Sequence, residues 1–158
     1  MALYMKYGNI KGAVTTDGFK DWIELNSFQW GVGRHIGTAA RGSTSREHSE
    51  PNLSEVTVTK LGDIATPKLF LDAVAGKLDN KVTIKFTTTT KGKVETFLTY
   101  EMEKTGLSHY SLSSSGDMPM ESMSLNFTKI IEKFSGMDPA ISGTPESVGY
   151  DLTLMKTV

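Results

Sequence analysis

Apolar and polar side chains alternate with a period of two residues along most of the chain. The alternation is clearest over residues 55–59, 82–87, 98–102, 123–127 and 148–154. Each segment predicts a strand with one buried and one solvated face, as in antiparallel sheets. In the last segment, the side chains predicted to be buried are Val148, Tyr150, Leu152 and Leu154. So many half-buried strands predict a mainly β fold, a compact β-barrel or sandwich of two antiparallel sheets.

The alternation breaks once, between residues 22 and 30. Apolar side chains occupy odd positions up to Leu25 and even positions from Phe28 onwards. A change of this kind near Asn26 predicts a bulge or corner, where a strand passes from one sheet to the other. Gln29 would then point away from the core.

One short α-helix is predicted from about Thr66 to Lys77. Thr66 is expected to cap its start, Pro67 suits the first turn, and Gly76 supplies the stop. The side chains that share one helical face are apolar: Leu69, Phe70, Ala73 and Val74. We expect this face to cover an open end of the barrel or one sheet edge.

A long extended loop is predicted from Ile36 to Asn52, because this stretch is polar and lacks periodicity. The three arginines of the chain lie in or beside it, together with two glutamates: Arg34, Arg41, Arg46, Glu47 and Glu50. Arginine carries a planar, weakly hydrated group that suits interface ion pairs. The loop is therefore either an exposed segment of mixed charge or a contact with a partner subunit, and the sequence leaves both open.

Composition argues against several classes of function. The 158 residues suit one domain, residues 1–158, and a formal net charge of -1 argues against general binding to nucleic acid or anionic membranes. The chain has no cysteine, which excludes disulfides and a cysteine nucleophile. No ordinary signal peptide is visible, so we expect a cytoplasmic protein whose export, if any, needs no cleavable signal.

The candidate chemistry is sparse. The three histidines lack the spacing of metal ligands and are predicted to be solvated or structural: His35, His48 and His109. A triad assembled in space is neither excluded nor supported. The glycines at positions 31, 33 and 37 lack the context of a dinucleotide loop, and no phosphate loop or nucleophile elbow occurs. We therefore predict no catalytic residue, no cofactor and no metal.

Several motifs, in this order and spacing, resemble one family. They are residues 22–24, 27–31, 55–60 with Asp63, 66–70, 113–117, 121–129, and 149–152 with Lys156. The stretch Asn126-Phe127-Thr128-Lys129 and the Thr66-Pro67 helix start are the most specific of them. Together they resemble the haemolysin-coregulated protein (Hcp) family, the tube protein of the bacterial type VI secretion system.

The resemblance implies a structural protein that forms hexameric rings, which stack into an inner tube and carry effectors in the lumen. It also implies partners in the tip (spike) protein and in the sheath and baseplate, and release from the cell with the tip. Gln29 lies in a segment that resembles the family's lumen-facing strand, which implies that it faces the lumen and contacts effectors; the alternative is an ordinary solvent-facing glutamine. Two alternatives stay open: a protein like those of phage tail tubes, and a monomeric β-barrel that binds a small ligand. The second would need polar groups that converge on an apolar pocket.

Overall fold

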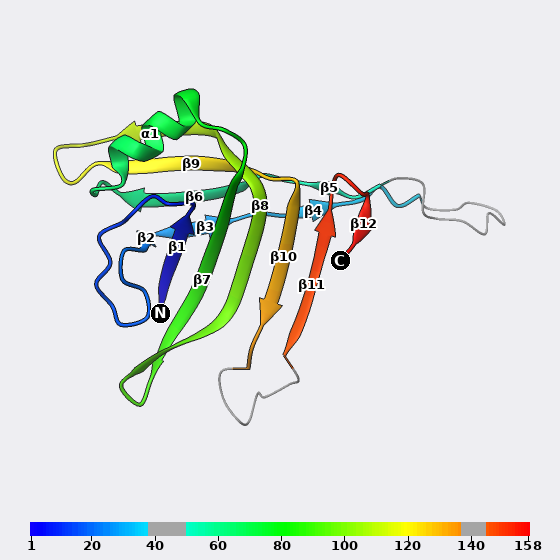
Figure 1. Cartoon of the computed structure of the whole chain (residues 1–158), viewed down its shortest axis with the longest axis horizontal. Coiled ribbons are helices and arrows are strands. Elements are labelled where there is room, and N and C mark those ends of the chain that lie inside the picture. Colours follow the sequence, from blue (N-terminus) through cyan, green and yellow to red (C-terminus); the bar gives the residue numbers. More distant parts are fainter. Residues whose placement is uncertain (38–49, 137–144) are drawn as a thin grey trace.

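The computed structural model describes residues 1–37, 50–136 and 145–158. These residues form one helix, α1 (Thr66–Ala75), and twelve strands (Figure 1). The strands are β1 (Ala2–Tyr7), β2 (Ile23–Leu25), β3 (Ser27–Gln29), β4 (Val32–Gly33), β5 (Asn52–Leu53), β6 (Val56–Leu61), β7 (Asn80–Thr90), β8 (Lys93–Ser113), β9 (Met120–Asn126), β10 (Lys129–Phe134), β11 (Glu146–Asp151) and β12 (Lys156–Thr157).

Two antiparallel sheets share strand β8, which confirms the predicted fold class. Sheet A runs in the order β12-β11-β10-β8-β7-β1-β2, and sheet B in the order β3-β6-β9-β8. Their strands cross at a steep angle in Figure 1, with β10 to β12 extending sheet A beyond the barrel. The short strands β4 and β5 pair separately, so Asn52 belongs to a strand and not to the predicted loop.

Strand β8 is 21 residues long and turns from one sheet into the other. Its first half pairs with β7 and β10, and its second half, from Gly106, pairs with β9. The register shifts between Leu107 and His109, and such a bulge bends a strand. The alternation pattern predicted only residues 98–102 of this strand, because its second half is mostly polar.

The second sheet-changing corner lies where the alternation pattern breaks. Strand β2 pairs with β1 in sheet A, whereas β3 pairs with β6 in sheet B. Between them, the Asn26 backbone N–H donates to the carbonyl oxygen of Thr59 at 2.7 Å. The predicted corner is confirmed.

The core between the sheets consists mainly of apolar side chains that face inward from the strands, including Met5, Ile84 and Leu125, all fully buried. Phe127 is 5% exposed. The prediction was wrong for Val148 and Leu154, which are 60% and 59% exposed. Val148 lies on the part of sheet A that extends past the barrel, and Leu154 lies in a turn.

Helix α1 differs from its prediction in three respects. It ends at Ala75, two residues earlier than expected, and its N-cap is Ala65 and not Thr66. The Thr66 hydroxyl instead accepts the backbone N–H of Asp63 at 3.0 Å, and the Asp63 carboxylate accepts the backbone N–H of Ala65 at 2.9 Å. Of the predicted apolar face only Leu69 is buried.

Candidate functional site

The outer surface of sheet B is a candidate contact surface because polar side chains follow its register across four strands. One row runs from Gln29 through Thr57 and Ser124 to His109, and the next from Ser27 through Thr59 and Ser122 to Ser111. Residues directly opposite each other in antiparallel strands point to the same side of a sheet. We call these eight residues the polar face.

The polar face is rich in hydroxyl groups and has no formal charge when His109 is neutral. The Ser27 and Thr59 hydroxyls lie 2.6 Å apart and hydrogen-bond across the β3–β6 pair. Hydroxyls both donate and accept hydrogen bonds, so this surface can interact with polar groups of many kinds. Its chemistry suits contact with a passing or bound surface.

Gln29 is exposed and lies at one end of the first row of the polar face. Its neighbours Phe28 and Trp30 are partly buried and pack against the core. The side chain therefore points away from the core, as the alternation indicates. That it faces a lumen and contacts an effector stays a prediction.

Behind the polar face lies a buried ionic cluster of Lys60, Asp63 and Glu121. Lys60 and Glu121 are both fully buried and form an ion pair, and the Lys60 ammonium also contacts Asp63 Oδ1 at 2.9 Å. The Lys60 ammonium donates a third hydrogen bond to the carbonyl oxygen of Leu61, at 2.8 Å. All three ammonium donors are thus satisfied, as a buried charge requires.

Glu121 also connects the cluster to neighbouring elements. Its Oε2 accepts from the Thr66 hydroxyl at 3.0 Å, and its Oε1 accepts from the Tyr110 hydroxyl. Burial raises the pKa of Tyr110 above its usual range, and the hydrogen bond to Glu121 raises it further. The cluster therefore joins β6, β9, β8 and the start of α1 behind the polar face.

The predicted loop contacts fall partly within the described residues. Arg34 and Glu50 are both exposed, and they flank the β4–β5 pair, whose register brings them to the same end of that ribbon. Arg41, Arg46 and Glu47 lie outside the described residues, as does His48. The role of this segment as a subunit contact stays a prediction.

An apolar cleft lies between the β3–β5 segment and strands β10 to β12. Its volume is about 360 Å³, and it is lined mainly by apolar and aromatic side chains, among them Trp30, Val32, Leu53, Val148 and Tyr150. Trp30 and Leu53 pack against the main core, so the cleft opens directly beside it.

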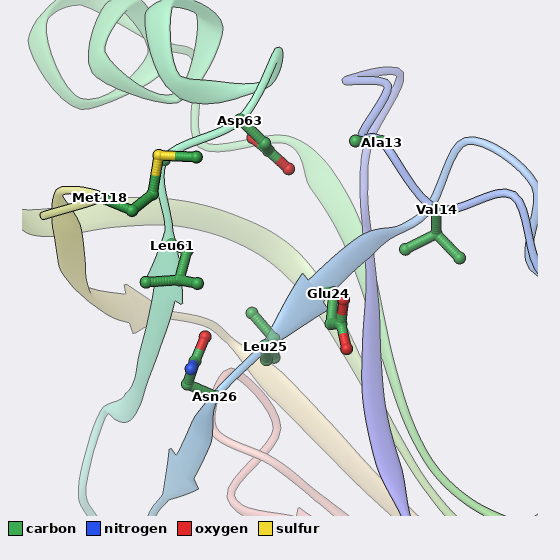
Figure 2. Close-up of a pocket in the computed structure, with 9 residues that line it drawn as sticks. Ala13, Val14, Glu24, Leu25, Asn26, Leu61, Asp63 and Met118 are labelled. Atoms are coloured by element: carbon green, nitrogen blue, oxygen red, sulfur yellow. The ribbon is translucent and has the colours of Figure 1, made fainter.

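A second cavity, of about 310 Å³, lies beside the corner at Asn26 (Figure 2). Its carboxylates are Glu24 on β2 and Asp63 before α1, and Asp63 is already paired with Lys60. The Asp63 carboxylate is therefore not free to bind a small ligand in this cavity, whereas a small-ligand site needs free polar groups that converge on an apolar pocket.

The described residues offer neither a metal site nor a membrane-spanning helix. His35 and His109 are both exposed. Within residues 1–37, 50–136 and 145–158, no cluster of histidine and carboxylate side chains could hold a metal ion. The same residues contain no helix that is long and apolar enough to cross a bilayer.

Known proteins share this architecture. The family model described as "Type VI secretion system effector, Hcp" matches residues 4–134. A solved structure described as a type six secretion system protein is 25% identical, with a TM-score of 0.89 over 99% of both chains. Hcp1 from Salmonella typhimurium is 20% identical, with a TM-score of 0.74 over 100% of both chains.

A type VI secretion system effector from Yersinia pestis has the same fold. It is 17% identical, with a TM-score of 0.74 over 94% of this chain and 98% of that chain. No curated protein matches the chain.

Proposed function

Since the chain belongs to the Hcp family of type VI secretion proteins, we propose that it assembles into hexameric rings. These rings stack into the inner tube of that secretion system. Members of the family are structural, secreted proteins and not enzymes. In this assembly the polar face lines the lumen and carries effectors. The tip protein caps the tube, and the sheath and baseplate surround it. The tube leaves the cell with its tip, by a route that needs no cleavable signal.

The observation that carries the proposal is the position of the polar face between two strand edges. Strand β3 pairs only with β6 among the described strands, and the second half of β8 pairs only with β9. Copies placed side by side at these edges would continue the polar face from one subunit to the next. A head-to-tail contact of this kind generates a ring when the rotation closes.

The loop around residues 36–52 contributes a second contact in this proposal. Arg34, Arg41 and Arg46, with Glu47 and Glu50, reach onto the adjacent subunit and form ion pairs there. Replacing Arg41 and Arg46 with Glu should shift the rings towards monomers without altering the fold. An unchanged oligomer in sedimentation would show that the loop is not an essential contact.

Solution mass by light scattering tests the ring directly. A hexamer has six times the chain mass of 17.3 kDa. A stable monomer at high micromolar concentration would contradict the proposal and favour a small-ligand-binding module instead.

Cargo contact at Gln29 is tested separately, by pull-down of lumenal effectors. Gln29→Arg should reduce effector recovery without changing ring mass, because it places a charge on an uncharged surface. Thr89→Arg is the matched control, since Thr89 is exposed on β7 and lies outside the polar face. Equal recovery with both variants, across several effectors, would contradict a recognition role for Gln29.

A further inference from the structure

Helix α1 exposes an apolar surface that no other described residue covers. Phe70, Leu71 and Val74 are 57%, 63% and 68% exposed, and Leu78, in the turn that follows, is 68% exposed. Phe70 and Val74 lie four apart and therefore share one side of the helix, and Leu78 follows in the turn after the helix ends at Ala75. We call these four residues the apolar helix face. An exposed apolar group of this kind commonly marks an interaction site.

The apolar helix face lies beside the edge of β8 that is unpaired among the described strands. The ring centroids of Phe70 and Tyr110 lie 6.0 Å apart, and Tyr110 belongs to the second half of β8. Leu78 lies against Gly106, where an added Cβ would meet the Leu78 side chain at 2.3 Å. Asn80, just after the turn, donates to the carbonyl oxygen of Thr105 at 3.1 Å. These contacts hold the helix and its turn beside the half of β8 that pairs only with β9.

The apolar cleft lies beside the other free edge of sheet B. Trp30 and Val32 follow β3 directly in the chain, and both line the cleft. On the opposite side, Val148 is 60% exposed, as is Val32. Figure 1 shows α1 and the β4–β5 ribbon at opposite ends of the molecule, so the helix of one chain cannot fill its own cleft.

We propose that the apolar helix face of one copy docks into the apolar cleft of the next copy, on the side of sheet B away from the lumen. The inference rests on the proposed ring. In that ring the β8 edge of one copy meets the β3 edge of the next, and this places the two apolar surfaces together. A ridge on one side of the subunit and a cleft on the other make the contact heterologous, as ring closure requires.

Charge is complementary between the two surfaces. Lys68 and Lys77 are exposed on the helix and just after it. Glu132 is the charged residue that lines the cleft, and its carboxylate accepts from the Tyr100 hydroxyl at 2.5 Å. A lysine at the rim of the docked helix would place a cation near this carboxylate, which favours one orientation over others.

Cysteine crosslinking tests the contact. Because the chain has no cysteine of its own, only the introduced thiols can react. A Val74→Cys, Val148→Cys double variant, treated with a short thiol-reactive crosslinker, should give a ladder of covalent oligomers up to the ring. Each single variant should give no ladder, because a heterologous contact never brings two copies of one position together. A Met118→Cys, Val148→Cys variant is the control, since Met118 is 64% exposed and belongs to neither surface.

Substitution provides a second readout. Val148→Glu should raise the concentration for half-assembly by on the order of tenfold or more, because it places a charge in an apolar contact. Val74→Lys in the same chain should restore part of the loss, and Met118→Glu should leave assembly unchanged. Thermal melts of all variants at low concentration verify that each monomer is folded.

The outcomes separate this inference from the ring itself. A ladder from the Val74–Val148 pair alone, with partial rescue by opposite charges, supports the docking. Hexameric mass without a ladder overturns the docking while the ring proposal stands. A parent protein that is monomeric overturns both.

Discussion

Replacing Lys60 with methionine tests whether the buried ionic cluster supports the barrel. Methionine is similar in length to lysine and apolar, so Lys60→Met removes the charge and its three hydrogen-bond donors while it largely fills the same space. The carboxylates of Asp63 and Glu121 then lose their cation, and Glu121 is fully buried.

Breaking a buried ion pair by removing one partner costs about 3–5 kcal/mol. Glu121 keeps the hydroxyls of Thr66 and Tyr110 as donors, so we expect a loss near the lower end, about 3 kcal/mol. For a chain of this size that corresponds to a fall in melting temperature of about 6–12 °C.

Urea unfolding and thermal melts measure this loss, at one protein concentration because assembly adds to apparent stability. Lys133→Met is the matched control. Lys133 contacts Glu101 at 2.9 Å, but it is 44% exposed, and exposed pairs contribute only about 0–1 kcal/mol. Adding Glu121→Gln to Lys60→Met should recover part of the loss, because a neutral amide needs no cation. Equal unfolding free energies for Lys60→Met and Lys133→Met would refute the reasoning.

Three further predictions address the core, the histidines and alkaline stability. Phe127→Ala should lower the free energy of unfolding by about 3–5 kcal/mol in urea titrations, because Phe127 is 5% exposed. Single alanine substitutions of His35, His48 and His109 should leave ring mass and secretion unchanged. A histidine variant that assembles normally yet abolishes secretion would contradict this. Burial, then the hydrogen bond to Glu132, raises the pKa of Tyr100 to about 12. The neutral phenol is therefore favoured in the folded state, so this stabilisation is complete below about pH 10 and is lost as pH rises through 12. The stability difference between the parent and Tyr100→Phe should shrink accordingly, in urea titrations at about pH 9 and about pH 12.

The sequence predicted strands where one face is buried against the other sheet. Val56 and Val58 mark β6 in this way, and the break near Asn26 located the corner. Strand β1 was missed because Tyr4 and Met5 are adjacent and both buried, so it does not alternate. The second half of β8 was missed because much of it is solvated on both sides.

The buried ionic cluster leaves a signal in the sequence that is separate from any catalytic motif. Lys60 continues the buried positions of Val56 and Val58, and Glu121 continues those of Met123 and Leu125. Opposite charges at buried positions of two strands indicate an internal ion pair, once the strands are known to be neighbours. That neighbour relation is set by tertiary structure and is not visible along one strand.

The exposed residues of α1 show a different limit. Helical spacing predicts which side chains share a face, but not whether the same chain covers that face. Phe70 and Val74 share an apolar face, and within one chain they are open to solvent. Burial of such a face depends on a second molecule, which no pattern within one sequence specifies.

Because β8 belongs to both sheets, the two sheets cannot open independently. Separating sheet B from the barrel breaks backbone hydrogen bonds of β8 with β9, and separating sheet A breaks those of the same strand with β7 and β10. Local opening that frees one half of β8 therefore removes support from the other half. Native-state amide hydrogen exchange should accordingly report β7, β8, β9 and β10 as one cooperative unit, with similar opening free energies on either side of the bend.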